Sequence, residues 1–304
     1  MRIAPLTALI CLLLPLSVTA TPANFGQAKL EARQYIYYDR HTQGDAYCGC
    51  NWTWTGRSGG RVDLAGCGYQ VRAQANRAQR IEWEHIVPAS DFGRQRQCWQ
   101  QGGRAHCTAS DPMFSIMEAD LHNLTPVVGE VNADRSNYGF GLLTGTPAQH
   151  GQCDVRVDFA QRTVQPRAAF RGQIARTYFY MADRYDLRLS SAQQRLFMAW
   201  DRQYPVSDWE RERDRRVAAR MGHGNPFVSG VRQWSLNHRN SRDGLVSVVP
   251  GQAASAVVHG NRNSHIYHLS HCPGYTAMAE RNRVSFSSPA SAEAAGYRRA
   301  RNCP

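Results

Sequence analysis

Hydrophobic side chains recur at helical spacing near the start of the chain and again through its second half. Over residues 24–39, and again after Arg167, apolar residues return to one face every three or four positions. Ser190 and Ser207 each precede another such stretch and have Gln or Glu three residues later, which is the pattern of a capping box. We predict one helix over 24–39 and three more between 167 and 228.

Strand-like patterns are short and lie mainly in the first half of the chain. Alternating or β-branched runs bounded by Gly or Pro predict strands at 51–55, 80–87 and 155–159. The Gly- and Cys-rich segment 89–112 is expected to be a long loop or short helix, and 120–132 a turn followed by a helix. Helices that outnumber a few short strands predict a mixed α+β fold.

Composition divides the chain into four parts. Residues 1–20 have the charged start, the apolar run and the small-residue end of a signal peptide, with cleavage expected between Ala20 and Thr21. Residues 21–228 form the predicted main domain. Residues 229–258 are polar and aperiodic, as expected of a linker, and 259–304 form a small basic module. No run after the signal is long and apolar enough to span a bilayer. We therefore expect an exported, periplasmic or secreted protein without a membrane segment.

The formal net charge is +12, and Lys29 is the only lysine, so arginine supplies the positive charge. The guanidinium fork binds phosphate oxygens in pairs and stays charged, which favours a polyanionic partner such as nucleic acid. A solvated basic surface without a partner fits the same composition. Charge therefore suggests nucleic acid without establishing it.

Eight cysteines remain after the signal, and an even number in an exported chain favours disulfides. Cys98 and Cys107 flank the pair Gly102-Gly103, which predicts a local disulfide across a turn. Cys272 and Cys303 form the favoured pair in the C-terminal module. The pairing of the others is left open, and a zinc site is the weaker alternative for these four cysteines: Cys48, Cys50, Cys67 and Cys153.

An acid, an imidazole and a carboxamide stand out in two segments that lie some forty residues apart. Glu84 and His85 end the predicted strand, and Asn132 lies in the predicted helix. Oxygen ligands suit a hard divalent cation, and an imidazole can activate water. The runs RIEWEHIVPA, RQCWQQGGR and DLHNLTPVVGEVNADRSN, within 25–228, resemble the bacterial endonuclease I family, which are secreted nucleases with a ββα-metal (His-Me finger) motif.

This resemblance assigns roles to residues at matching positions. It implies that His85 is the general base, that Glu84 and Asn132 bind the metal, and that Arg104 contacts the scissile phosphate. Glu118 matches an acidic residue of the site whose role is less defined. His122 and Asn123 lie in the same motif and are expected to have a supporting or structural role, with a direct role of His122 in the site as the alternative.

The resemblance also implies the reaction. We expect a sequence-nonspecific endonuclease that uses Mg²⁺, with Ca²⁺ or Mn²⁺ as other possible ions, and leaves 5′-phosphate ends on DNA, single- or double-stranded, and on RNA. No recognition-helix pattern or paired dimer element is present. We therefore expect a monomer that does not bind specific bases. The implied fold is a ββα-metal motif surrounded by helices.

The C-terminal module resembles the small Ada-type metal-binding module. Its strands are expected near 265–268 and at 283–286, with a helix that begins at Pro289 and is capped by Ser288. Only Cys272 and Cys303 are present where that module has four thiolates. Zinc held by these two with His268 or His271 is therefore the minor alternative to a disulfide.

Two other functional classes fit parts of the sequence. A zinc protease lacks support because neither His-Glu-x-x-His nor His-x-x-Glu-His occurs. A noncatalytic secreted nucleic-acid-binding protein would explain the charge. It would not explain why Glu84, His85, Arg104 and Asn132 occur together.

Overall fold

The computed structural model describes residues 21–246 and 258–303, except 270, 271, 273, 287, 288 and 302. The chain divides into two compact units, Met1–Ser241 and Arg242–Pro304. The predicted signal (1–20), residues 247–257 of the predicted linker, His271 and Ser288 lie outside the described residues. Within the described residues, no helix has both the length and the apolar character needed to cross a membrane.

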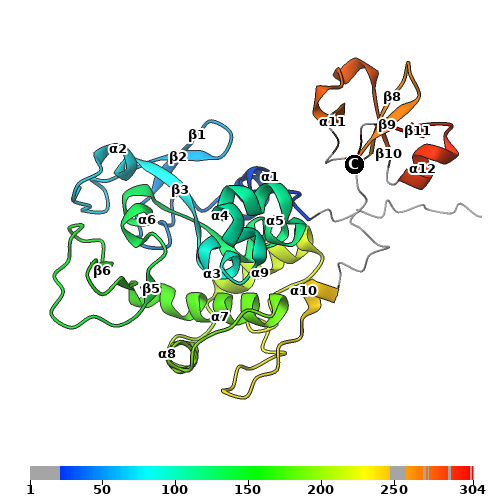
Figure 1. Ribbon diagram of the computed structural model, residues 1–304. Coiled ribbons are helices and arrows are strands. Elements are labelled where there is room, and N and C mark those ends of the chain that lie inside the picture. Colours follow the sequence, from blue (N-terminus) through cyan, green and yellow to red (C-terminus); the bar gives the residue numbers. More distant parts are fainter. Residues whose placement is uncertain are drawn as a thin grey trace, which may run out of the picture. The chain divides into compact units, whose positions relative to one another are not determined.

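The first unit mixes short strands with longer helices, as predicted (Figure 1). Its strands are β1 (Trp52–Thr55), β2 (Gly59–Val62), β3 (Arg80–His85), β4 (Leu124–Val128), β5 (Gly139–Phe140), β6 (Arg156–Asp158) and β7 (Thr163–Gln165). Its helices are α1 (Phe25–Glu31), α2 (Ala75–Ala78), α3 (Ala89–Gly93), α4 (Gln97–Ser110), α5 (Pro112–Glu118), α6 (Gly129–Arg135), α7 (Ala168–Tyr185), α8 (Ser191–Gln203) and α9 (Asp208–Met221). A π-helix (Ala32–Ile36) and a 3-10 turn (Leu121–Asn123) complete the regular structure up to residue 221.

The central element is an antiparallel sheet in the order β1-β2-β3-β4. Strands β3 and β4 pair from Ile81 opposite Val128 to His85 opposite Leu124. The β3–β4 pair followed directly by α6 is the ββα arrangement that the sequence implied. A smaller sheet has the order β5-β7-β6.

Four predictions about the elements need correction. Residues 124–128 form the strand β4, where a turn was expected. The strand was not predicted because every one of its residues is buried, so the sequence lacks the period-two pattern of a half-exposed strand. The segment 89–112, expected to be a long loop or one short helix, contains two helices, α3 and α4. The predicted helix 24–39 becomes a π-helix after Glu31. The capping box is complete at Ser190, whereas for Ser207 the structure records only the bond from the Glu210 N–H.

The core of the first unit forms where α1, the sheet and α9 meet. Trp83 of β3 packs with Tyr37, Leu124 and Val217 in one buried cluster. Arg213 of α9 is buried beneath it and donates to the carbonyls of Leu121, His122 and Leu124. Helix α9 therefore holds the beginning of β4 against the rest of the unit.

The predicted linker begins too early. Trp234 stacks on Phe179 of α7, with ring centroids 4.8 Å apart, so this part of 229–258 packs on the first unit. The buried carboxylate of Asp183 accepts hydrogen bonds from His238 Nε2 at 2.7 Å and from the Ser241 N–H at 2.8 Å. The first unit thus extends to Ser241.

A chain that ends at Val228 is expected to be less stable than one that ends at Ser241. The shorter chain exposes Phe179 and leaves the buried Asp183 carboxylate without these donors, and an unsatisfied buried polar group costs about 1–3 kcal/mol. Urea unfolding of residues 21–228 and 21–241 measures the difference. Equal midpoints would show that the segment 229–241 does not stabilise the unit.

The second unit contains a sheet in the order β10-β8-β9-β11. Its elements, after a short helix α10 (Asp243–Val246), are β8 (Val258–Asn261), β9 (Ile266–His268), α11 (Gly274–Ala277), a 3-10 turn (Glu280–Asn282), β10 (Arg283–Phe286), α12 (Pro289–Ala294) and β11 (Arg298–Arg299). The strands predicted near 265–268 and at 283–286 and the helix at Pro289 are confirmed.

Candidate active site

A cleft of about 800 Å³ opens along β3 in the first unit. Residues of α1, β3, α4 and α6 line it, and residues of β2, α2 and α3 complete its walls. Four of the predicted site residues are among those that line the cleft: Glu84, His85, Arg104 and Asn132. The fold therefore brings together residues that are up to 48 positions apart in the sequence.

His85 is the last residue of β3, and its ring is buried at the edge of the cleft. Its Nε2 lies 2.8 Å from the backbone carbonyl oxygen of Glu118. A carbonyl only accepts hydrogen bonds, so Nε2 carries the hydrogen and Nδ1 keeps its lone pair. Burial lowers the pKa of His85 to about 3, so the imidazole is neutral at physiological pH and Nδ1 can take a proton.

Glu84 is buried beside His85, and two donors hold one of its oxygens. Its Oε1 accepts from the Tyr47 hydroxyl at 2.7 Å and lies 3.1 Å from Nη1 of Arg135. Burial raises the pKa of this carboxyl, while the Arg135 charge acts in the opposite direction. Strand alternation would place Glu84 and His85 on opposite faces, but β3 ends at His85 and both side chains line the cleft.

Arg135 was not recognised from the sequence, although it holds both residues at the end of β3. Its guanidinium is 1% exposed and donates to the carbonyl oxygens of His85 at 3.1 Å and Ile86 at 2.7 Å. It also packs over the ring of Phe140. The available signal was its position three residues after Asn132, which puts both residues on the same side of α6.

Glu82 was also missed, and it orients Asn132. Its Oε2 accepts from Asn132 Nδ2 at 2.9 Å, and Arg77 and Arg80 both bind Oε1 at 2.9 Å. A Cβ at Gly129 would lie 2.9 Å from the Glu82 side chain, so α6 approaches β3 closely because a glycine stands there. Glu82 lies two residues before Glu84, on the same face of the strand.

Arg104 enters the cleft from α4, where the helix is interrupted. Gly103 has φ of +63° and breaks the helical geometry, and the predicted disulfide Cys98–Cys107 closes the segment. Arg104 Nε donates to Glu118 Oε1 at 2.6 Å. Glu118 is buried and is not among the described residues that line the cleft, so it contacts the site through Arg104 and through its backbone carbonyl.

His122 and Asn123 lie behind the cleft. The carboxamide of Asn123 accepts from the Val87 N–H at 2.7 Å and donates to the Val87 carbonyl at 2.9 Å, which fixes the chain just beyond His85. His122 is 1% exposed, and its Nε2 lies 3.1 Å from the backbone carbonyl of His223. Burial lowers its pKa to about 3. Neither residue is among those described as lining the cleft.

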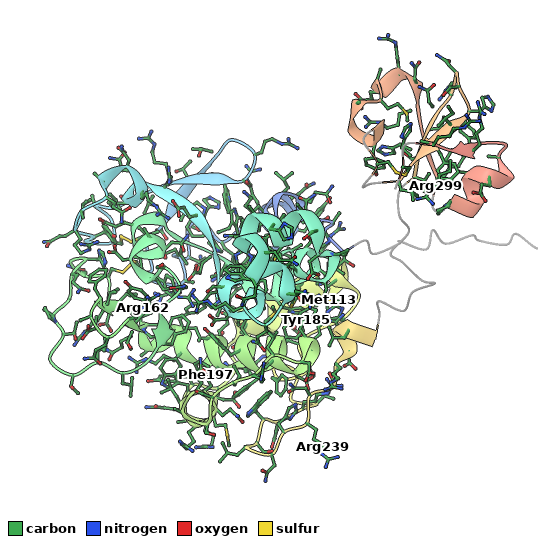
Figure 2. All side chains as sticks on the ribbon, viewed as in Figure 1. Met113, Arg162, Tyr185, Phe197, Arg239 and Arg299 are labelled. Atoms are coloured by element: carbon green, nitrogen blue, oxygen red, sulfur yellow. A yellow bond between two sulfur atoms is a disulfide. The ribbon has the colours of Figure 1, made fainter. Side chains whose placement is uncertain are left out.

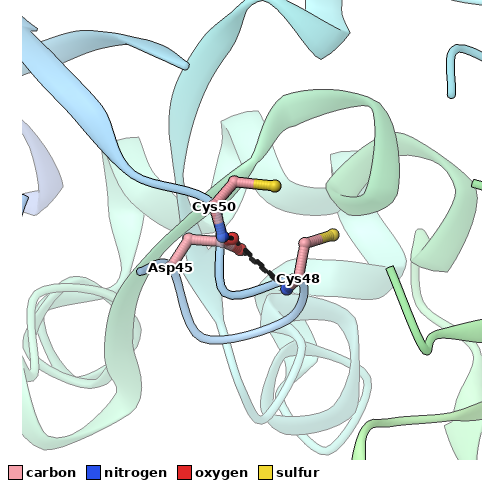
Figure 3. Close-up of side chains that lie close together, drawn as sticks. All are labelled: Asp45, Cys48 and Cys50. Carbon is pink, nitrogen blue, oxygen red and sulfur yellow. Dashed lines mark hydrogen bonds between the residues drawn. The ribbon is translucent and has the colours of Figure 1, made fainter. Parts of the chain in front are cut away.

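The four cysteines considered for zinc are joined in two disulfides, Cys48–Cys153 and Cys50–Cys67, so that alternative is wrong. Figure 3 shows Asp45 beside Cys48 and Cys50. The buried Asp45 carboxylate accepts backbone N–H bonds from both cysteines and from Tyr47, and this accounts for its position. Each of these sulfurs is oxidised in a disulfide, so none can bind a metal ion as a thiolate.

The remaining cysteine pairs agree with prediction. Cys98 is joined to Cys107, and Cys272 to Cys303. The minor zinc alternative in the second unit required free thiols at Cys272 and Cys303, so the disulfide overturns it.

The sequence of residues 24–231 matches the family model of Endonuclease I. The chain belongs to the endonuclease I family. An extracellular deoxyribonuclease of Aeromonas hydrophila is 55% identical over 183 residues, which cover 60% of this chain and 80% of that protein. A periplasmic deoxyribonuclease of the same organism is 54% identical over 183 residues, with 60% and 76% covered.

A third relative is more distant in sequence but covers more of the chain. Endonuclease-1 of Buchnera aphidicola is 43% identical over 208 residues, 68% of this chain and 81% of that protein. The family match ends at residue 231. The second unit therefore lies outside it, and its resemblance to an Ada-type module stays a prediction.

Proposed function

We propose that the chain is an exported endonuclease that hydrolyses DNA and RNA without sequence preference, with one divalent metal ion, and leaves 5′-phosphate and 3′-hydroxyl ends. The observation that carries this proposal is the state of His85. A neutral imidazole, with Nε2 donating to the Glu118 carbonyl, presents Nδ1 as a base to the cleft.

In the proposed reaction Nδ1 of His85 takes a proton from a water molecule as the oxygen attacks phosphorus. The bond between phosphorus and the 3′-oxygen then breaks, and the leaving oxygen is protonated by water. The Glu118 carbonyl stabilises the imidazolium that forms, because the hydrogen bond from Nε2 strengthens when the ring becomes charged.

The donor set fits a hard divalent cation. Tyr47 and Arg135 both contact Oε1 of Glu84, and Oε2 is the oxygen proposed to bind the ion. Glu82 binds the nitrogen of Asn132, so the carboxamide oxygen is oriented away from it. One carboxylate and one amide oxygen suit Mg²⁺, with Ca²⁺ or Mn²⁺ as alternatives. When bound, the ion neutralises charge on the phosphate and on the leaving oxygen.

Arg104 is proposed to bind the scissile phosphate. Its side chain is 47% exposed at the cleft, and Glu118 holds Nε while the Nη groups are left for phosphate oxygens. Arg77, Arg80 and Lys29 also line the cleft and extend its positive charge. Phosphate contacts carry no base information, which supports action on many sequences and on both DNA and RNA.

Export is proposed from residues 1–20, and the four disulfides fit an oxidising compartment. The two most similar relatives reported above are named extracellular and periplasmic deoxyribonucleases. The periplasm or the exterior is therefore the proposed location.

Glu82→Ala is expected to raise the Mg²⁺ concentration needed for half-maximal cleavage by about 10–100-fold, because residues that orient metal ligands typically have effects of that size. Without Glu82 the Asn132 carboxamide can rotate its oxygen out of place. Calorimetric titration of Mg²⁺ into the variant measures the affinity directly. Excess Mg²⁺ should restore the rate, and an unchanged Mg²⁺ affinity would exclude this role for Glu82.

The decisive experiment for the function is cleavage of supercoiled plasmid and of RNA by residues 21–304, with Mg²⁺ and with EDTA. The proposal expects cutting of both substrates that chelation abolishes, and ligatable 5′-phosphate ends. Protein that binds plasmid but leaves it uncut across several divalent ions and pH values would instead be a noncatalytic nucleic-acid-binding protein.

A further inference from the structure

The second unit carries a charge excess that the nuclease chemistry does not use. Residues 258–304 contain six arginines and two glutamates, and no lysine or aspartate, which gives four net positive charges. Five of these arginines are exposed: Arg262, Arg281, Arg298, Arg299 and Arg301. The unit lies outside the family match.

One face of its sheet is the hydrophobic core of the unit. Val258 and Tyr267 are buried there with Ala292 of α12, and Phe286 and Tyr297 pack against them. In β8 and β9 the buried residues alternate with half-buried ones, so the second set of residues points to the opposite face. Helix α12 packs on the first face, whereas α11 lies against part of the second: Tyr275 stacks on His259, and Gly274 lies close to the His268 ring.

A row of paired residues crosses this second face from edge to edge. Arg283 of β10 is opposite Asn261 of β8, Asn261 is opposite Ile266 of β9, and Ile266 is opposite Arg298 of β11. Directly paired residues share a face, so an arginine stands at each end of the row. With strands about 4.8 Å apart, the two Cα atoms are roughly 14 Å apart.

The neighbouring row is also polar. Ser285, His259 and His268 lie opposite one another in β10, β8 and β9. The His259 ring stacks on the Tyr275 ring, with centroids 4.1 Å apart. The Arg283 guanidinium donates to the Met278 carbonyl, which fixes the position of this arginine. Because α11 covers the two histidines, the part of this face proposed for binding is the row that runs from Arg283 to Arg298.

We propose that this basic sheet face binds the phosphate backbone of nucleic acid and holds the substrate near the nuclease unit. A polyanion complements arginines at both edges, whereas an apolar partner would find few apolar side chains on this face. This inference rests on the proposed function, because it assumes that nucleic acid is the substrate. It adds a second binding surface to the cleft.

Arg298 and Arg299 provide a matched pair for the test. They are adjacent on β11 and both exposed, but Arg298 pairs with Ile266 on the basic face and Arg299 with Tyr267 on the core side. Figure 2 labels Arg299 in this unit. The same change in charge is thus placed on opposite faces of one strand.

The experiment measures binding of fluorescent single-stranded and duplex DNA to full-length His85→Ala protein, so that cleavage does not interfere. Arg298→Gln is expected to weaken binding several-fold and to reduce the salt slope by about 0.7 for single strands or 0.9 for duplex. Arg299→Gln should leave both unchanged. Loss with only one of the two probes assigns the face to that form of nucleic acid.

Three results would overturn the inference. Equal losses for Arg298→Gln and Arg299→Gln would mean that overall charge, not this face, matters. No loss for either would mean that the face does not bind DNA. A loss of heparin binding without a loss of DNA binding would assign the face to anionic polysaccharide. Failure of the nuclease proposal is recognised separately, since it appears as absent plasmid cleavage by the unsubstituted protein.

Discussion

His85→Ala is expected to reduce the rate of plasmid cleavage by about 10²–10⁴-fold, the usual contribution of a positioned general base. The expected loss follows from the ring's geometry, because Nδ1 is the proposed base and the contact between Nε2 and the Glu118 carbonyl orients the ring. DNA binding, measured by anisotropy in the presence of Ca²⁺, should change little. A variant that cuts at the unsubstituted rate would refute the assigned base.

The same substitution has a second, independent consequence for stability. The pKa of His85 falls from an ordinary value of 6.5 to about 3 on folding, because the ring is buried. Between these values the unfolded chain binds a proton that the folded chain does not, so this histidine makes stability decrease as the pH falls from about 6.5 toward 3. His85→Ala removes this contribution.

His122→Ala is the matched control, because burial lowers its pKa to about 3 as well. It should likewise reduce the loss of stability at low pH, yet it should leave the base at position 85 in place. Urea unfolding at pH 7 and pH 5 combined with cleavage assays separates the two. Equal loss of activity in His85→Ala and His122→Ala would indicate that His85→Ala acts by disturbing the structure and not by removing a general base.

The resemblance to the family named the residues of the candidate site, and their roles stay predictions, whereas several of the surrounding elements were not predicted. Glu84, His85, Arg104 and Asn132 were placed by their resemblance to a family, and the structure brings all four to one cleft. These four residues could be recognised because each lies in a short contiguous sequence motif. Their distance from one another in the folded chain depends on β3 pairing with β4, which no local pattern specified.

Strand β4 was not predicted for a definable reason. Its five residues are all buried, so the sequence shows no alternation, and Pro126 argues against a strand. Because β4 is the edge of its sheet, a residue without an N–H is tolerated opposite Trp83. Tertiary packing, not local propensity, made this segment extended.

The residues that support the site were invisible for a different reason. Glu82 and Arg135 are charged, and a charged side chain in a sequence is ordinarily assigned to the surface. Only the close approach of α6 to β3 at Gly129 turns them into partners of Asn132 and Glu84. By contrast, the disulfide Cys98–Cys107 was predictable because its two ends are near in sequence.

Arg135→Met is expected to destabilise the folded protein by about 3–5 kcal/mol, the cost of removing one partner from a buried ion pair. Both side chains are nearly inaccessible to water, and Glu84 would keep the Tyr47 hydroxyl as a donor but lose its positively charged partner. The carbonyls of His85 and Ile86 also lose their donors. Urea unfolding in EDTA measures the change.

The double variant Arg135→Met/Glu84→Gln separates charge from packing. If the unpaired carboxylate causes the loss, removing its charge should restore a large part of the stability while cleavage stays absent, because a proposed metal ligand is gone. Mg²⁺ should stabilise Arg135→Met more than it stabilises the double variant, since the bound cation replaces the missing positive charge beside Glu84. Equal stabilisation of the two by Mg²⁺ would mean that Glu84 does not bind the ion.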